Sequence, residues 1–223
     1  MERHFDEELT LLKQRLLQMA DTAQEMIGLA IKSLVDRKEA LAKDVFDLED
    51  KVNHIEVEIE DEVLKLLALR QPAARDLRLL TAILKINNDL ERVADQAVNI
   101  AELSIYLLKE PVLKPLIDIP HMANLAQKMI KNSLEAFVRH DAKLAKEVCS
   151  DDDEVDRIND QIFRELLTYM MEDAKSITRA VDLILVSRNL ERIADHATNI
   201  SEDVIFIEEG KNIKHHIHDE PAA

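Results

Sequence analysis

The sequence repeats itself, and this duplication constrains the fold more than any other feature. A block of six residues recurs 103 positions further along the chain: Met19, Ala20, Ala23, Gln24, Met26 and Ile27 return as Met122, Ala123, Ala126, Gln127, Met129 and Ile130. Later the offset becomes 100, which carries Leu90-Glu91-Arg92-Val93-Ala94-Asp95 onto Leu190-Glu191-Arg192-Ile193-Ala194-Asp195. Two offsets in the same chain order are typical of a duplicated structural unit. The sequence therefore predicts two similar halves.

Glycine is scarce, with two residues among 223. Tight β-turns and dinucleotide-binding loops need residues that tolerate positive φ, so β-hairpin, sandwich and Rossmann architectures are disfavoured. Apolar residues make up 47% of the chain, which is enough for a sizeable core. Long helices joined by few turns fit this composition.

Apolar residues recur every three or four positions, which indicates amphipathic helices in both halves. The first stripe comprises Leu9, Leu12, Leu16, Met19, Ala23, Met26, Ala30 and Leu34, and the second comprises Val52, Ile55, Ile59, Val63 and Leu66. Pro72 ends the second helix because proline lacks an amide donor. The remaining helices are predicted at about 73–108, 121–139, 141–171 and 176–209, with Gly210 as the last C-cap.

These patterns predict an all-α fold of two tandem, pseudo-symmetric three-helix bundles. We expect the first bundle over residues 1–110 and the second over 121–210. Pro111, Pro115 and Pro120 mark a linker over 111–120. Residues 211–223, with His215, His216 and His218, are predicted to be a peripheral tail.

The charge balance disfavours several classes of partner. Lys plus Arg number 29 and Asp plus Glu 45, which gives a formal net charge of −16. Such a chain repels nucleic-acid backbones and anionic membranes. No apolar run approaches the roughly 20 residues of a membrane span, and the charged N-terminus does not resemble a signal peptide. With one cysteine, Cys149, we expect a soluble cytosolic protein without an intrachain disulfide.

Carboxylates follow one face of the third predicted helix, opposite its apolar residues. Glu91, Asp95, Asn99 and Glu102 lie at i, i+4, i+8 and i+11, and the sixth helix repeats them as Glu191, Asp195, Asn199 and Glu202. Similar sets lie beside the apolar stripes of the second and fifth helices, namely Glu49, Asp50 and Asn53, and Asp152, Asp153 and Asp156. The sequence thus predicts one acidic surface in each half.

Clustered carboxylate and amide oxygens suit hard cations such as Mg²⁺, Mn²⁺, Ca²⁺ or iron. A cation would also relieve the repulsion between like charges one helical turn apart. Two alternatives stay open: the acidic face is simply solvated, or Arg92 and Arg192 bond carboxylates on adjacent helices. No P-loop, HExxH or Glu-x-x-His motif is present. His196 is interpreted as incidental, and Cys149 as a small packing residue.

Several segments resemble the PhoU family, the regulators associated with phosphate-specific transport. The paired segments Leu90–Asp95 and Leu190–Asp195 are similar to the family's signature. Arg70-Gln71-Pro72-Ala73-Ala74-Arg75-Asp76-Leu77-Arg78 and Thr168-Tyr169-Met170-Met171-Glu172-Asp173 are similar to other segments of its two halves. The resemblance extends from about Phe5 to Glu209.

The resemblance implies a cytoplasmic, non-enzymatic negative regulator of phosphate uptake, commonly a homodimer. Its implied partners are the ATPase subunit of a phosphate ABC transporter and the sensor histidine kinase of the phosphate regulon, which would bring it to the inner membrane peripherally.

The resemblance also implies metal binding at motifs in which Glu or Asp is followed four residues later by Asp. The matching pairs are Glu91 with Asp95, Glu191 with Asp195, Asp152 with Asp156, and Glu49 with Asn53, where Asn53 departs from the motif. The implied ions are divalent or iron-type: Fe, Mn, Mg or Zn. The alternative functions are a metal-dependent helical-bundle enzyme and a passive helical scaffold without metal.

Overall fold

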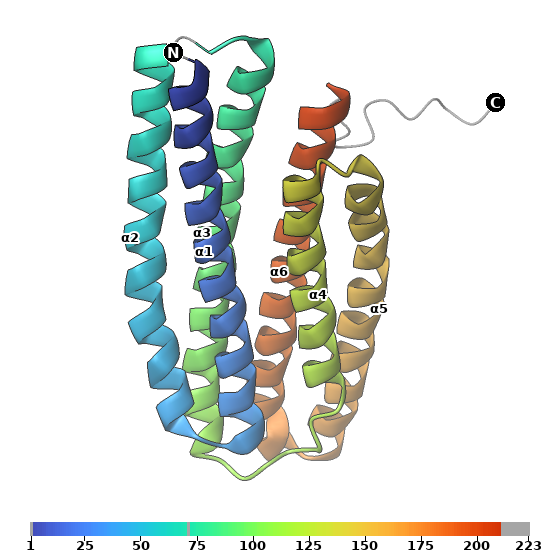
Figure 1. Cartoon of the computed structure of the whole chain (residues 1–223). Coiled ribbons are helices and arrows are strands. Elements are labelled where there is room, and N and C mark those ends of the chain that lie inside the picture. Colours follow the sequence, from blue (N-terminus) through green and yellow to red (C-terminus); the bar gives the residue numbers. More distant parts are fainter. Residues whose placement is uncertain (1, 71, 211–223) are drawn as a thin grey trace, which may run out of the picture.

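The computed structural model describes residues 2–70 and 72–210, which form two three-helix bundles side by side (Figure 1). The first bundle comprises α1 (Glu2–Asp36), α2 (Glu39–Arg70) and α3 (Ala74–Leu108). The second comprises α4 (Asp118–Arg139), α5 (Ala142–Glu172) and α6 (Ile177–Glu209), with a short 3₁₀ helix, η1 (Ala174–Ser176), before α6. The described residues contain no strand. The prediction of an all-α fold with two three-helix bundles is confirmed.

The helix ends follow from local chemistry. α4 begins at Asp118, three residues before the predicted start, because Pro120 lies in the first turn, where its missing amide breaks no helical hydrogen bond. The Asp141 carboxylate caps α5 by accepting hydrogen bonds from the amides of Lys143 and Leu144, both at 3.0 Å. Gly210 ends α6 with φ of 68°, as predicted for a C-cap.

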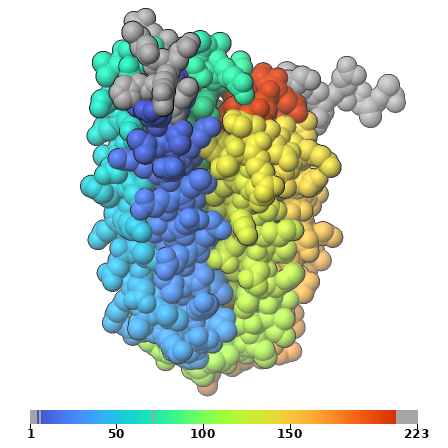
Figure 2. Space-filling model, viewed as in Figure 1, coloured from blue at the N-terminus to red at the C-terminus, as the bar shows by residue number. Residues whose placement is uncertain are grey.

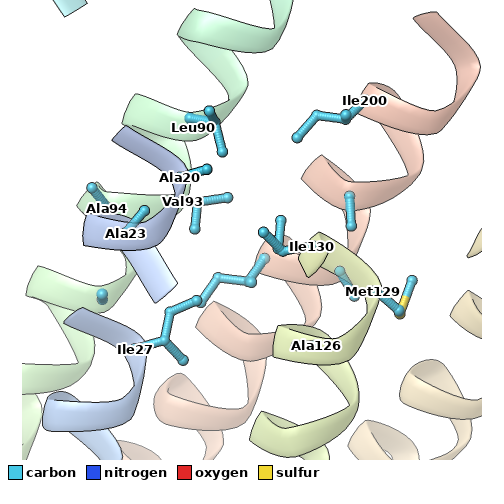
Figure 3. Close-up of a cluster of buried hydrophobic side chains, with 14 of the residues drawn as sticks. Ala20, Ala23, Ile27, Leu90, Val93, Ala94, Ala126, Met129, Ile130 and Ile200 are labelled. Carbon is cyan, nitrogen blue, oxygen red and sulfur yellow. The ribbon is translucent and has the colours of Figure 1, made fainter. Parts of the chain in front are cut away.

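A single hydrophobic core runs through both bundles rather than one core in each. α3 packs against α6 and α1 against α4, and Figure 2 shows α1 and α4 in contact along the front of the molecule. Figure 3 shows side chains of these four helices gathered in one cluster that includes Ile27, Val93, Ile130 and Ile200. Many of the residues in this cluster are alanines, which allow the helices to approach one another closely. The two bundles therefore form one packed body.

Positively charged side chains hold the connections between helices at the lower end of Figure 1. Arg37 follows α1 with φ of 56°, and its guanidinium donates to the carbonyl oxygens of Leu107, Leu108 and Glu110. These bonds satisfy carbonyl groups at the end of α3 that have no partner within the helix. In the linker, the buried Lys114 ammonium pairs with the Glu165 carboxylate of α5. The linker is thus fixed to both bundles.

None of the helices formed by the described residues is both long enough and apolar enough to cross a lipid bilayer.

Candidate functional site: acidic surfaces on both bundles

The acidic residues of the second half meet where α5 packs beside α6. α5 contributes Asp152, Asp153 and Asp156, and α6 contributes Glu191 and Asp195; each pair at i, i+4 presents its carboxylates one turn apart on its helix. Charge interactions join the two helices, because Asp195 and Glu191 both raise the pKa of Asp152. The structure therefore brings together the residues that the sequence placed on separate helices.

An amide that sequence analysis missed holds part of this cluster in place. The Asn159 side-chain amide donates to Glu191 Oε2 at 2.9 Å, and its carbonyl oxygen accepts from the Ser187 hydroxyl at 2.8 Å. Asn159 thus connects α5 to two positions on α6 and orients the Glu191 carboxylate. Its sequence signal is its place three residues after Asp156 on the same face of α5.

The carboxylates of the second cluster are partly buried and repel one another. Burial, together with the charges of Asp195, Asp156, Asp153 and Glu191, raises the pKa of the Asp152 carboxyl to about 7. Among the described residues, Asp152 Oδ1 is a buried oxygen with no hydrogen-bond partner. A positive charge at this point would lower the free energy of the ionised cluster.

The other two carboxylates respond to the same neighbours. The pKa of Glu191 is raised by burial and by Asp156 and Asp195, against a lowering by the hydrogen bond from Asn159 and by Arg188. The pKa of Asp195 is raised by burial and by Asp156, against the lowering effect of His196 and Arg192. Among the described residues, the Arg192 guanidinium acts on Asp195 of its own helix, and no ion pair supports the alternative that it bonds a carboxylate of an adjacent helix.

The first bundle carries a weaker version of this surface between α2 and α3. Burial and the charges of Asp95, Asp50 and Glu102 raise the pKa of Glu49, and burial together with Asp95 and Glu56 raises that of Glu91. Asn53, the counterpart of Asp156, is exposed and neutral.

An arginine partly neutralises this first cluster. The Arg92 guanidinium lies 3.5 Å from Glu91 Oε2 and 3.7 Å from Asp95 Oδ2, both on its own helix, and its charge also lowers the pKa of Glu56 on α2. The first surface therefore has fewer free carboxylates than the second.

The remaining candidate ligands lie at the edges of these clusters or are directed away from them. Asn99 and Glu102 are exposed on α3, and Glu202 is half-buried on α6 close enough to Cys149 to raise the pKa of its thiol. The Asn199 amide is directed instead to Asp89 of α3, at 3.3 Å. The histidine group at 215–218 lies outside the described residues.

His196, interpreted from the sequence as incidental, lies at the contact between the bundles. Its Nδ1 is 2.8 Å from Asp89 Oδ1 on α3, and a second pair joins Lys85 of α3 to the buried Asp203 of α6 at 3.1 Å. The sequence interpretation concerned site chemistry and rested on the counterpart Gln96; it did not anticipate this contact between the bundles. The sequence did contain one sign of this contact: charged residues such as Asp89 and Asp203 lie on helix faces that also carry core residues.

Cys149 is half-buried, and burial raises the pKa of its thiol to about 11. The thiol stays protonated at neutral pH, which agrees with the predicted packing role.

The arrangement is a set of hard oxygen donors suited to a cation, but it is not a closed cage. No three His, Cys, Asp or Glu side chains within residues 2–70 and 72–210 converge closely enough to hold one metal ion as they stand. Binding a metal would require rotamer changes that draw carboxylates of the two helices together. A hollow of about 520 Å³ on the outer surface of α6 lies beside two of these carboxylates and is lined by Arg188, Glu191, Arg192 and Asp195 among others.

Comparison with known proteins places the whole chain in one family. The PhoU domain matches residues 16–104 and again residues 119–204, one match in each bundle. The chain is 39% identical to a phosphate-specific transport system accessory protein PhoU homolog of Pseudomonas aeruginosa, over 96% of this chain and 88% of that protein. It is 42% identical to the homolog with the same description in Aquifex aeolicus, over 93% of this chain and 94% of that protein.

Two solved structures of PhoU proteins have the same fold as this chain. The crystal structure of PhoU from Pseudomonas aeruginosa superposes with a TM-score of 0.90 at 40% identity, covering 93% of this chain and all of that one. The phosphate transport system regulatory protein PhoU from Streptococcus pneumoniae gives 0.87 at 27% identity, covering 94% of this chain and 99% of that one. The duplicated signature, the two bundles and these matches together make the chain a member of the PhoU family.

Proposed function

We propose that this protein is a cytoplasmic negative regulator of phosphate uptake that binds the ATPase subunit of a phosphate ABC transporter and the sensor kinase of the phosphate regulon. The observation that carries the proposal is the near full-length match to proteins described as phosphate-specific transport accessory proteins. The proposed role is one of binding rather than catalysis, and we extend it to a homodimer.

The regulatory role is tested by deleting the gene in its own organism. We expect phosphate uptake and a phosphate-regulon reporter to stay high in phosphate-rich medium, and a plasmid copy of the gene to lower both. Purified chain should also bind the purified ATPase subunit of the same organism. Unchanged uptake and reporter activity in the deletion strain would refute the regulatory role, and absence of binding would refute the proposed partner.

We further propose that the α5–α6 acidic cluster binds a divalent or iron-type cation. The donor chemistry fits: Asp152, Asp156, Glu191 and Asp195 supply carboxylate oxygens, and Asp152 Oδ1 is buried without a partner among the described residues. A bound cation would neutralise this surface and fix α5 against α6. The α2–α3 surface fits less well because of Asn53 and Arg92.

The duplication provides a matched control for the metal proposal. Asp152 corresponds to Glu49 in the first bundle, by the offset of 103. We expect the thermal midpoint of the wild type, after treatment with a chelator, to rise on addition of Mn²⁺ or Fe²⁺. Asp152→Asn should remove most of that rise and Glu49→Gln should remove little. Elemental analysis without metal, combined with an unchanged midpoint, would exclude the cation site while leaving the regulatory role open.

A further inference from the structure

An uncovered set of apolar side chains lies on the second bundle next to its acidic cluster. Six residues, between 39% and 88% exposed, form this set, which we call the apolar ladder: Phe163, Leu167 and Met171 on α5, and Ile177, Val181 and Leu185 on α6. Single exposed apolar residues are ordinary, but a contiguous group marks an interaction surface.

The spacing makes the ladder regular. On each helix the three residues lie at i, i+4 and i+8, so they share one face and span about 12 Å. α5 and α6 are antiparallel neighbours joined through η1, so Met171 and Ile177 lie near the same end of the bundle. Leu167 and Val181 form the next level, and Phe163 and Leu185 the third.

The first bundle shows that the fold does not require this surface. At the positions matching Phe163, Val181 and Leu185 it has Glu60, Thr81 and the ion-paired Lys85. These residues occupy equivalent places in the same three-helix arrangement. At the positions matching Leu167 and Ile177 the first bundle does have exposed leucines, Leu64 and Leu77, so only the complete ladder is confined to the second bundle.

The ladder continues directly into the acidic cluster. Leu185 lines the same hollow as Glu191 and Asp195, and on α5 Asp156 lies two turns before Phe163 on a neighbouring line of the helix. The two arginines at the outer side of α6, Arg188 and Arg192, are outnumbered by the four carboxylates of the cluster, Asp152, Asp156, Glu191 and Asp195. One continuous surface is therefore apolar at one end and acidic at the other.

We propose that this surface of α5 and α6 binds an amphipathic helix of a partner protein, with apolar residues over the ladder and Lys or Arg over the carboxylates. The stretch from Met171 to Asp152 is about 28 Å long, which matches a helix of roughly 18–20 residues. Apolar anchors at helical spacing are the usual way a groove holds a helix, and basic residues complement both the cluster and a chain of net charge −16.

Two other occupants fit the charges less well. An anionic membrane would meet the carboxylates with like charge. A second copy of the chain, packed through a two-fold axis, would place the acidic end of one subunit beside the surface of another strongly acidic chain. Both are distinguished by the experiment below, which requires neither a transporter nor a metal.

The probe is a labelled 20-residue helical peptide with Leu at i, i+4 and i+8 in one half and Lys on the same face in the other. Its affinity for the full chain is measured by fluorescence anisotropy in a chelating buffer. The control peptides carry Glu in place of Lys, or the same residues in scrambled order. The protein variants are Leu167→Ser with Val181→Ser, and the matched first-bundle variant Leu64→Ser; circular dichroism confirms that each is folded.

We expect the Lys peptide to bind at least about tenfold more tightly than either control, a difference of about 1.4 kcal/mol. The double variant should lose at least tenfold in affinity and Leu64→Ser less than twofold. Asp156→Asn with Glu191→Gln should weaken binding and reduce its salt dependence. Equal affinity for the Lys and Glu peptides, or an equal loss in Leu64→Ser, would overturn the proposal.

Two further results would assign the surface to another occupant and overturn the proposal. One is a dimer that sediments as a monomer once Leu167 and Val181 are changed. The other is binding to vesicles containing anionic lipid that the same two changes abolish.

Discussion

Replacing Asp152 by Asn should stabilise the metal-free protein, and the gain should depend on pH. The pKa of Asp152 rises from its ordinary 3.8 to about 7 because the carboxyl is half-buried beside Asp195 and Asp156. A rise of about three pKa units corresponds to about 4 kcal/mol at 1.36 kcal/mol per unit. Solvent screens a half-exposed group, so the expected gain is reduced to about 1–2 kcal/mol.

The sign follows from linkage between protonation and folding. Because the folded-state pKa of Asp152 is the higher one, stability from this group is fully present below about pH 4. It is lost as pH rises toward 7 and stays lost above that value. The difference in unfolding free energy between Asp152→Asn and wild type should therefore be near zero at pH 4 and reach its maximum by pH 8.

Urea unfolding followed by circular dichroism, from pH 4 to 8 in a chelating buffer, measures this difference. Low protein concentration is needed because the pH range includes the pI of about 4.9, where a net charge near zero promotes association. Asp44→Asn, on the exposed face of α2 and outside the acidic clusters, serves as the control. A gain for Asp152→Asn that is equal at pH 4 and pH 8, or no gain at pH 8, would refute the account of the cluster as a site of charge repulsion.

Three further outcomes are expected. Gly28→Ala should raise the unfolding free energy by about 0.5–1 kcal/mol, because alanine favours a helix interior. The new methyl group would lie 3.5 Å from Gln127 Nε2, which is an ordinary contact. A loss of stability in thermal melts would contradict this. The Cys149 thiol should react with iodoacetamide at pH 7.5 about a hundredfold more slowly than a free cysteine, because its pKa is raised to about 11; a rate within a few-fold of free cysteine would exclude such burial. Asp89→Ala should cost about 1–3 kcal/mol, more than His196→Ala, because the buried face of α6 then loses the acceptor for two side chains; equal losses in urea titrations would place the stabilisation elsewhere.

The architecture could be predicted because the buried face of each helix appears in the sequence as apolar residues every three or four positions. The stripe from Leu9 to Leu34 is buried on one side of α1, and proline and glycine marked several helix ends within a few residues. The two acidic surfaces could be placed on the correct helices because the duplication supplied each pattern twice. Whether these residues bind metal stays a prediction.

What could not be predicted depends on which helix faces meet across the two bundles. Periodicity shows that a face is buried but does not name the helix that buries it, so the pairing of His196 with Asp89 was missed. Asn159 was missed for a related reason: a polar residue beside a core stripe reads as solvent-facing until its neighbour on α6 is known. The apolar ladder also needed the structure, because its residues look like core in the sequence alone.

The contact between α3 and α6 also makes the two halves recognise each other. Under the duplication, Asp89 and His196 correspond to Asn189 and Gln96, and Lys85 and Asp203 correspond to Leu185 and Leu103. Two first halves brought together in the same way would set Asp89 against an amide and Lys85 against a leucine, so both charge pairs would be lost. The halves, if produced as separate chains, should therefore assemble as a heterodimer in preference to either homodimer.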